Sequence, residues 1–245
     1  MNKKHTFVRA LSIATTVVLL SLSYANAAEK EKHLFILSGQ SNMALLDPNI
    51  SFTPTLETNF GKDNIIVVKS AKGSQPIRRW YKKWKPGQGD QHEATGDFGD
   101  LYDVLMKKVV KALKGEKPAT VTFVWMQGER DARERHGDVY AASLKGLIDQ
   151  LATDLGHKDV NVVIGRLSDF DMGNKGWPDW TKVREAQVEV ADSAPHGDWV
   201  DTDDLNDGMN RRGDQVTNDL HCSVEGYKTL GKRFAEKSIE LIEKR

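Results

Sequence analysis

Five short runs of apolar residues recur along the chain and predict strands: residues 34–37, 65–68, 121–126, 160–164 and 199–200. Near-continuous apolar runs are typical of parallel strands that are covered on both faces, whereas half-exposed strands alternate apolar with polar positions. The pattern therefore predicts a mostly parallel, five-stranded sheet buried between other elements.

Amphipathic helices are predicted between these strands and after the last one. Apolar positions three and four residues apart mark helices within residues 101–112 and 140–155, which end at Gly115 and Gly156. Further helices are expected over residues 182–192 and 227–241. This alternation predicts a doubly wound, three-layer α/β/α domain, in which functional residues gather where strands end and helices begin.

Residues 1–27 have the pattern of a secretory signal peptide. A basic start precedes an apolar run over residues 10–22 and a small-residue cleavage site that ends at Ala27. The alternative is a membrane-spanning helix, but such a helix needs about 20 mostly apolar residues, and this run is shorter. We expect cleavage after Ala27, one domain over residues 28–245, no stable membrane insertion, and a periplasmic or secreted location.

Charge and cysteine content narrow the choice of partners and compartment. Lys plus Arg equals Asp plus Glu at 35 each, so no overall field attracts nucleic acid. Cys222 is the only cysteine, which excludes an intramolecular disulfide and suits a bacterial periplasmic protein with a large core. Cys222 follows His221 directly, but adjacent side chains in an extended segment point apart, which disfavours Cys222 as a nucleophile.

Ser41 follows the first predicted strand by a short glycine-containing turn, in the segment Ser38-Gly39-Gln40-Ser41-Asn42-Met43. A hydroxyl at this strand-to-helix junction would be exposed at the carboxyl edge of the sheet, and its own N–H could help to hold an oxyanion. The alternative is a serine that only caps a helix. Ser41 is therefore a candidate nucleophile.

His221 precedes the last predicted helix and has a carboxylate, Asp219, two residues before it. A carboxylate so placed can accept from one ring nitrogen and leave the other to take a proton from a serine. A histidine before a helix can also be a surface or capping residue. The pairing with Asp219 makes His221 the candidate general base.

Three blocks together resemble the carbohydrate esterases related to sialate O-acetylesterase, within the SGNH hydrolase superfamily: Gly39-Gln40-Ser41-Asn42-Met43, Trp125-Met126-Gln127-Gly128-Glu129-Arg130-Asp131 and Asp219-Leu220-His221. They occur in the family's order and span essentially the whole mature chain. The resemblance implies a flavodoxin-like three-layer fold and deacetylation of O-acetylated sugars through an acyl-serine intermediate, with no metal or organic cofactor.

The resemblance also implies an oxyanion hole formed by the N–H groups of Ser41 and Gly73 and the side-chain amide of Gln127. The chain departs from the superfamily pattern at Asn218, where an acid is common three residues before the histidine, so Asp219 must serve instead. It departs again at Arg130, which could touch substrate or pair with a neighbouring acid.

Other chemistries have weaker support. Glu129 and Asp131 could form a glycosidase pair, but such carboxylates usually come from different elements, and we interpret these two as structural. The histidines are scattered and no metal-binding spacing is present.

Residues 72–97 contain four glycines, two prolines and three aromatic residues with little periodicity, and we interpret them as a long functional loop. Trp80 could stack on a sugar ring, or it could pack a helix on the core together with Trp84. Trp177 and Trp180 lie in a loop pattern that favours a place at the rim of a site.

The sequence therefore predicts an exported carbohydrate O-acetylesterase whose partner is an acetylated carbohydrate. Two alternatives stay open: an SGNH esterase or lipase acting on a non-sugar ester, and a non-catalytic carbohydrate-binding relative.

Overall fold

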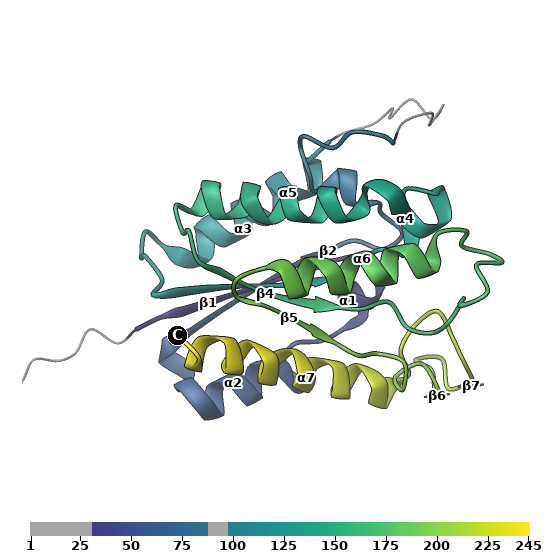
Figure 1. Cartoon of the computed structure of the whole chain (residues 1–245). Coiled ribbons are helices and arrows are strands. Elements are labelled where there is room, and N and C mark those ends of the chain that lie inside the picture. Colours follow the sequence, from purple (N-terminus) through teal and green to yellow (C-terminus); the bar gives the residue numbers. More distant parts are fainter. Residues whose placement is uncertain (1–30, 88–97) are drawn as a thin grey trace, which may run out of the picture. The chain divides into compact units, whose positions relative to one another are not determined.

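The computed structural model describes residues 31–87 and 98–245, which leaves the predicted signal peptide and residues 88–97 outside the described part. The five expected strands are present and all pair in parallel in the order β2-β1-β3-β4-β5 (Figure 1). They are β1 (His33–Gly39), β2 (Ile65–Ala71), β3 (Thr120–Met126), β4 (Val160–Gly165) and β5 (Gly197–Val200).

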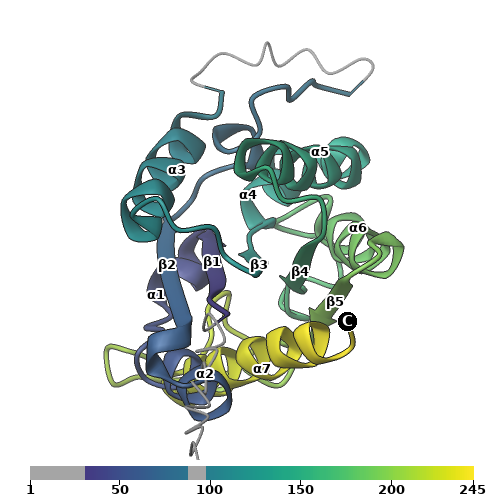
Figure 2. The same ribbon diagram turned by 90° about the vertical axis from the view of Figure 1, so that its left-hand side faces the viewer.

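Helices cover both faces of this sheet. One face carries α3 (Asp100–Leu113), α5 (Gly137–Leu155) and α6 (Trp180–Ser193), and the other carries α2 (Phe52–Phe60) and α7 (Val224–Glu243) (Figures 1 and 2). Alternate residues of β1 enter separate apolar clusters on the two faces, Leu34 and Ile36 on one side and Phe35 and Leu37 on the other. Burial on both sides explains why the strands read as continuous apolar runs.

The predicted helices are confirmed, and several short elements join them. These are α1 (Ser41–Leu45), α4 (Glu129–Glu134), the 3₁₀ helices η1 (Lys62–Asn64) and η2 (Ile77–Arg79), and the paired strands β6 (Gly208–Met209) and β7 (Gln215–Val216). Of these, the pattern indicated only the start of α1. None of the helices in the described ranges has the length and apolar character needed to cross a membrane.

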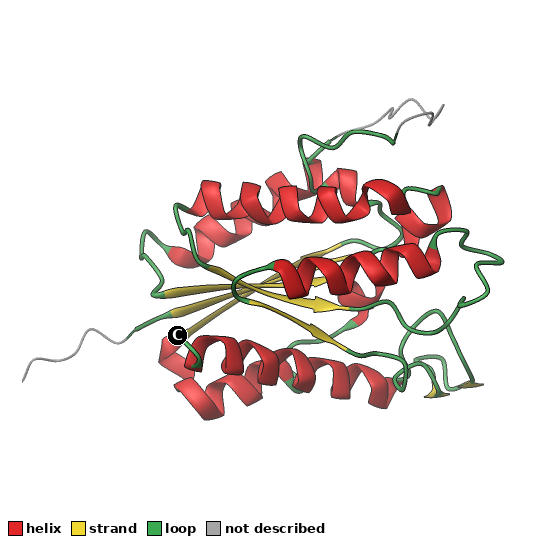
Figure 3. Cartoon of the chain, viewed as in Figure 1, coloured by secondary structure: helices red, strands yellow, loops and turns green. Residues whose placement is uncertain are grey.

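The strand order places a topological switch point between β1 and β3. The chain leaves β1 toward β2 on one side, and the later strands add on the other side. In open parallel sheets, ligands bind in the crevice beyond the carboxyl ends of the strands at such a point. Figure 3 shows the loops and short helices that follow the strand ends at this edge.

Candidate active site

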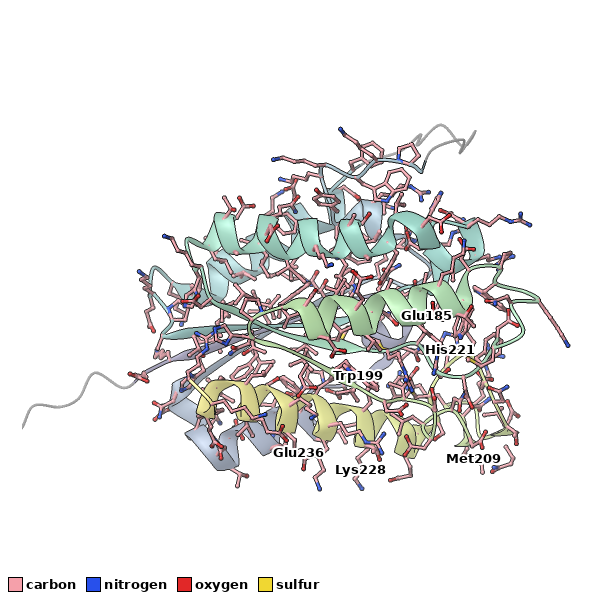
Figure 4. The ribbon with its side chains drawn as sticks, viewed as in Figure 1. Glu185, Trp199, Met209, His221, Lys228 and Glu236 are labelled. Atoms are coloured by element: carbon pink, nitrogen blue, oxygen red, sulfur yellow. The ribbon has the colours of Figure 1, made fainter. Side chains whose placement is uncertain are left out.

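Ser41 and His221 meet at the carboxyl edge of the sheet. Ser41 begins α1, with only Gln40 between it and the end of β1, and His221 lies in the loop before α7. The Nε2 atom of His221 lies 3.0 Å from Ser41 Oγ, although 180 positions separate the two residues. Figure 4 shows His221 at the side where the parallel strands end.

The surroundings of His221 favour the neutral form of its imidazole. Burial of the ring lowers its pKa below the ordinary value of 6.5, and the negative charge of Asp219 opposes this shift. A neutral imidazole has one ring nitrogen that can accept a proton, whereas an imidazolium has none. The environment therefore suits a group that takes a proton from Ser41.

Asp219, rather than Asn218, lies beside the imidazole. The Asp219 Oδ1 atom is 3.7 Å from His221 Nδ1 and accepts a hydrogen bond from the His221 backbone N–H at 2.8 Å. The Asn218 side chain instead accepts from Asn206 and donates to the carbonyl of Phe170. Asp219 thus both supports the backbone of His221 and places a negative charge near its ring.

Gly39 allows the end of β1 to lie against the end of β3. Its φ angle of +143° favours glycine, and a Cβ at this position would lie 1.9 Å from the carbonyl oxygen of Met126. The same carbonyl accepts a hydrogen bond from the backbone N–H of Gln40 at 3.0 Å. The contact between Gly39 and Met126 fixes the conformation of the turn that leads to Ser41.

Gly73 brings a second backbone segment next to Ser41. A Cβ on Gly73 would lie 3.7 Å from the Cβ of Ser41. Within the described residues, the backbone N–H groups of Ser41 and Gly73 donate to no other group. Two unused N–H donors beside a serine hydroxyl can stabilise negative charge on an acyl oxygen.

The structure differs from the expectation for Gln127. Its side chain is fully buried, and Nε2 donates to Asp131 Oδ2 at 2.6 Å, with the Gln75 carbonyl and Gln40 Oε1 also within 3.2 Å. Its Oε1 accepts from the Tyr140 hydroxyl at 3.0 Å. The two N–H groups of this amide face protein acceptors in this structure, which differs from the free donor expected beside Ser41.

Asn42 connects the turn that contains Ser41 to the loop that contains His221. Its Nδ2 donates to the carbonyl of Leu220 at 3.1 Å and to Glu129 Oε1 at 3.0 Å. Its Oδ1 accepts from the N–H of Cys222 and from the hydroxyl of Tyr227. This buried amide therefore joins the blocks that the sequence shows as three separate motifs.

Glu129 and Asp131 act as buried hydrogen-bond acceptors, as the structural interpretation predicts. Burial raises the pKa of each to about 7, and Asp131 Oδ2 also accepts from the backbone N–H of Ile77 in η2. Their side chains are 2% and 0% exposed, respectively. Such carboxyls cannot flank a glycosidic bond, which disfavours the glycosidase hypothesis.

Trp80 and Trp180 do not form a sugar-stacking surface. Each is 1% exposed; Trp80 packs edge-on against Trp125, and Trp180 Nε1 donates to the carbonyl of Ser168. Trp84 is buried as well. The assignment of Trp80 and Trp180 to substrate binding is corrected, because both rings are buried in the apolar core. The first part of the loop expected over residues 72–97 is also anchored in the core, because Ile77, Trp80 and Trp84 are buried; residues 88–97 lie outside the described residues.

Trp177 and Arg130 are more accessible. Trp177 is half-buried and packs edge-on against Phe170. The Arg130 side chain is 39% exposed, and its Nε donates to Glu134 Oε1 at 2.6 Å. Arg130 therefore pairs with a neighbouring acid, one of the two roles considered for it.

A surface hollow and the Cys222 thiol lie apart from the chemistry of Ser41 and His221. A hollow of about 720 Å³ beside β5 and α7 is lined by Trp199, Glu236 and ion-paired side chains, none of which belongs to the Ser41 site (Figure 4). Burial raises the pKa of the Cys222 thiol to about 12, so it stays protonated at neutral pH. Among the described residues, no cluster of three or more potential metal ligands is found.

Sequence reasoning missed the structural roles of Gln40 and Asn42. Both are polar yet buried, at 3% and 4% exposure. The sequence feature that could have indicated these roles is the position of the two amides on either side of Ser41. They follow an apolar strand, where a buried amide needs hydrogen-bond partners.

Hydrolases of several folds have a serine and a histidine in hydrogen-bond contact, as Ser41 and His221 are at this edge of the parallel sheet. The family model for carbohydrate esterases, the sialic acid-specific acetylesterases, matches residues 44–240. The chain therefore belongs to this family, and it is a carboxylic ester hydrolase.

Solved structures share the fold. A protein from Arabidopsis thaliana has a TM-score of 0.64 and 18% identity, over 86% of this chain and 98% of that chain. A carbohydrate acetylesterase from Xanthomonas citri has a TM-score of 0.61 and 15% identity, over 86% and 56%. NanS has a TM-score of 0.59 and 13% identity, over 88% and 99%. No curated protein sequence matches the chain significantly.

Proposed function

We propose that the protein is a serine esterase that removes O-acetyl groups from carbohydrate through an acetyl-serine intermediate. The observation that carries this proposal is the 3.0 Å contact between Ser41 Oγ and His221 Nε2. Membership of the carbohydrate esterase family supports the choice of an acetylated sugar as substrate.

The reaction takes two acyl-transfer steps. His221 Nε2 removes the Ser41 proton as Oγ attacks the acetyl carbonyl, and the resulting oxyanion is held by the N–H groups of Ser41 and Gly73. The C–O bond to the sugar then breaks, and His221 gives its proton to the departing sugar oxygen. His221 then takes a proton from water as the water attacks the acetyl-serine carbonyl. As the bond to Ser41 Oγ breaks and acetate leaves, His221 returns the proton to Oγ and restores Ser41.

The identity of the nucleophile is tested with p-nitrophenyl acetate and the Ser41→Ala variant. We expect Ser41→Ala to lose at least a thousandfold in kcat, since removal of a triad member leaves only residual catalysis. A fluorophosphonate should label the peptide that contains Ser41. Labelling elsewhere, or activity retained in Ser41→Ala, would contradict the mechanism.

The substrate class is tested separately. Acetate release from acetylated polysaccharides, together with faster turnover of acetyl than of octanoyl esters, is expected of a carbohydrate acetylesterase. A preference for octanoyl esters would instead favour an esterase or lipase for non-sugar esters. Carbohydrate binding without any turnover would indicate a non-catalytic relative.

We also propose that the enzyme is exported, on the basis of the signal-peptide pattern in residues 1–27. Mass spectrometry of the protein from the bacterial periplasm should give a mature chain that begins at Ala28. Protein recovered there with residues 1–27 attached would contradict cleavage.

A further inference from the structure

The side chain of Gln40 is buried and its orientation is fixed. Its Oε1 accepts a hydrogen bond from the backbone N–H of Arg130 at 3.1 Å and lies 3.2 Å from Gln127 Nε2. A backbone N–H can only donate, so the oxygen of the Gln40 amide must face Arg130. The nitrogen of the same amide must then point away from α4.

The nitrogen of this amide has no acceptor among the residues that the structure describes. Within the described residues, Gln40 Nε2 makes no hydrogen bond, although the side chain is 97% buried, as its 3% exposure shows. Gln40 Nε2 is not among the fully buried polar atoms that lack a hydrogen-bond partner, so part of its surface is accessible to solvent. An amide held in place by its oxygen, with its N–H donors unused, is prepared to donate to a ligand.

Gln40 is next to Ser41 in the chain, and its amide lies near the residues that follow β2 and β3. Gln40 immediately precedes Ser41, and its amide is in contact with Gln127, whose Nε2 lies 3.1 Å from the carbonyl oxygen of Gln75, two residues beyond Gly73. The Gln40 amide thus lies near the carboxyl ends of β1, β2 and β3, the edge of the sheet at which Ser41 lies.

We propose that Gln40 Nε2 is the side-chain donor of the oxyanion hole, beside the N–H groups of Ser41 and Gly73. This assignment rests on the proposed serine mechanism. As Ser41 attacks, the acyl oxygen gains negative charge and accepts from Gln40 Nε2. Gln127 is then a positioning residue, which holds the Gln40 amide through its oxygen while Asp131 holds Gln127.

The Gln40→Glu variant separates donation from support. Glutamate keeps an oxygen that can accept from the Arg130 N–H, but it replaces the amide nitrogen with an oxygen that cannot donate and that repels an oxyanion. We expect kcat on p-nitrophenyl acetate to fall by a hundredfold or more, with KM changed less than about threefold, as for loss of one oxyanion-hole donor.

Gln150→Glu is the matched control. Gln150 Oε1 also accepts from a backbone N–H, that of Lys82, and its Nε2 donates to the carbonyl of Trp80, away from Ser41. The same amide-to-acid change there should leave kcat within about twofold of wild type. Thermal midpoints of both variants report whether each one is folded.

A crystal structure of the wild type after reaction with a p-nitrophenyl alkylphosphonate, which loses p-nitrophenolate and leaves a phosphonyl group on Ser41 Oγ, tests the geometry without any variant. The phosphonyl oxygen should lie within about 3.2 Å of Gln40 Nε2. Contact with Gln127 Nε2 instead, or a folded Gln40→Glu variant with wild-type kcat, would overturn the assignment alone. A wild-type protein without Ser41-dependent turnover would overturn the proposed function and this assignment with it.

Discussion

Asn42 holds the main chain on both sides of His221. Its Nδ2 donates to the carbonyl of Leu220, and its Oδ1 accepts from the N–H of Cys222. Because Asn42 directly follows Ser41, one side chain sets the position of His221 relative to Ser41. The hydrogen bonds of Asn42 to the backbone on both sides of His221 thus help to maintain the 3.0 Å contact between Ser41 Oγ and His221 Nε2.

Removal of this link should affect catalysis and stability together. Asn42→Ala leaves four partners without their hydrogen bonds, so we expect the free energy of unfolding to fall by about 3 kcal/mol. Displacement of the imidazole should lower kcat by about tenfold to a hundredfold. Urea unfolding and steady-state kinetics on the same protein measure both effects.

Tyr227→Phe is the control for Asn42→Ala, because it removes only the hydroxyl that donates to Asn42 Oδ1. We expect a loss of about 1 kcal/mol and a much smaller change in kcat. If Tyr227→Phe lost as much activity as Asn42→Ala, the link between Asn42 and the backbone around His221 would not be the cause.

The pH dependence of kcat/KM should reveal the state of His221. Burial lowers its pKa, so we expect the acid limb of the wild-type profile below pH 6.5. Because the charge of Asp219 raises this pKa, Asp219→Asn should move the acid limb to still lower pH. With Asp219 at 3.7 Å from Nδ1, we expect kcat to fall by about tenfold to a hundredfold, less than in a fully bonded triad.

Asn218→Ala serves as the comparison for Asp219→Asn, because the Asn218 amide bonds to Asn206 and Phe170 rather than to His221. Its pH profile should match that of the wild type. An acid limb that moves upward in Asp219→Asn would show that our account of the His221 pKa is wrong.

The buried carboxyl of Glu129 should contribute a characteristic pH dependence to stability. Burial raises its pKa from 4.5 to about 7, so between these values the folded protein binds more protons than the unfolded chain. Its contribution to the free energy of unfolding therefore decreases as pH rises from about 4.5 to 7 and is level above that.

Glu129→Gln removes this titration and keeps an acceptor for Asn42. Urea unfolding at several pH values between 5 and 7 should show a weaker fall of stability with rising pH in the variant than in the wild type. Identical pH dependence in the two proteins would mean that Glu129 does not titrate in this way.

Gly39→Ala should be severely destabilising, because the new methyl group would meet the carbonyl oxygen of Met126 at 1.9 Å. We expect a loss of more than about 3 kcal/mol. Gly156→Ala is the matched control: its φ angle is also positive, at +60°, but a Cβ there meets nothing within 4 Å, so about 1 kcal/mol is expected. Thermal unfolding distinguishes the two, and equal losses would contradict the steric explanation.

The sequence by itself determined the strands, the larger helices and their alternation. Strands buried on both faces must be apolar throughout, and amphipathic helices must repeat every three to four residues, so both leave a local pattern. The short helices α2 and α4 and the β6–β7 pair left no such pattern, because tertiary contacts stabilise them more than local preference does.

The sequence also placed Ser41, Asp219 and His221 in recognisable blocks, but only the tertiary structure decided which polar groups point into the site. Gln127 and Gln40 carry the same kind of side-chain amide, but their hydrogen bonds differ. The nitrogen of Gln127 donates to Asp131, whereas the hydrogen bond from the Arg130 N–H involves the oxygen of Gln40. Likewise, Trp80 and Trp177 are both aromatic residues near turns, and only packing buries one ring and leaves the other partly accessible. Local pattern records which residues are polar or apolar, whereas hydrogen-bond direction and burial arise from segments that are distant in the chain.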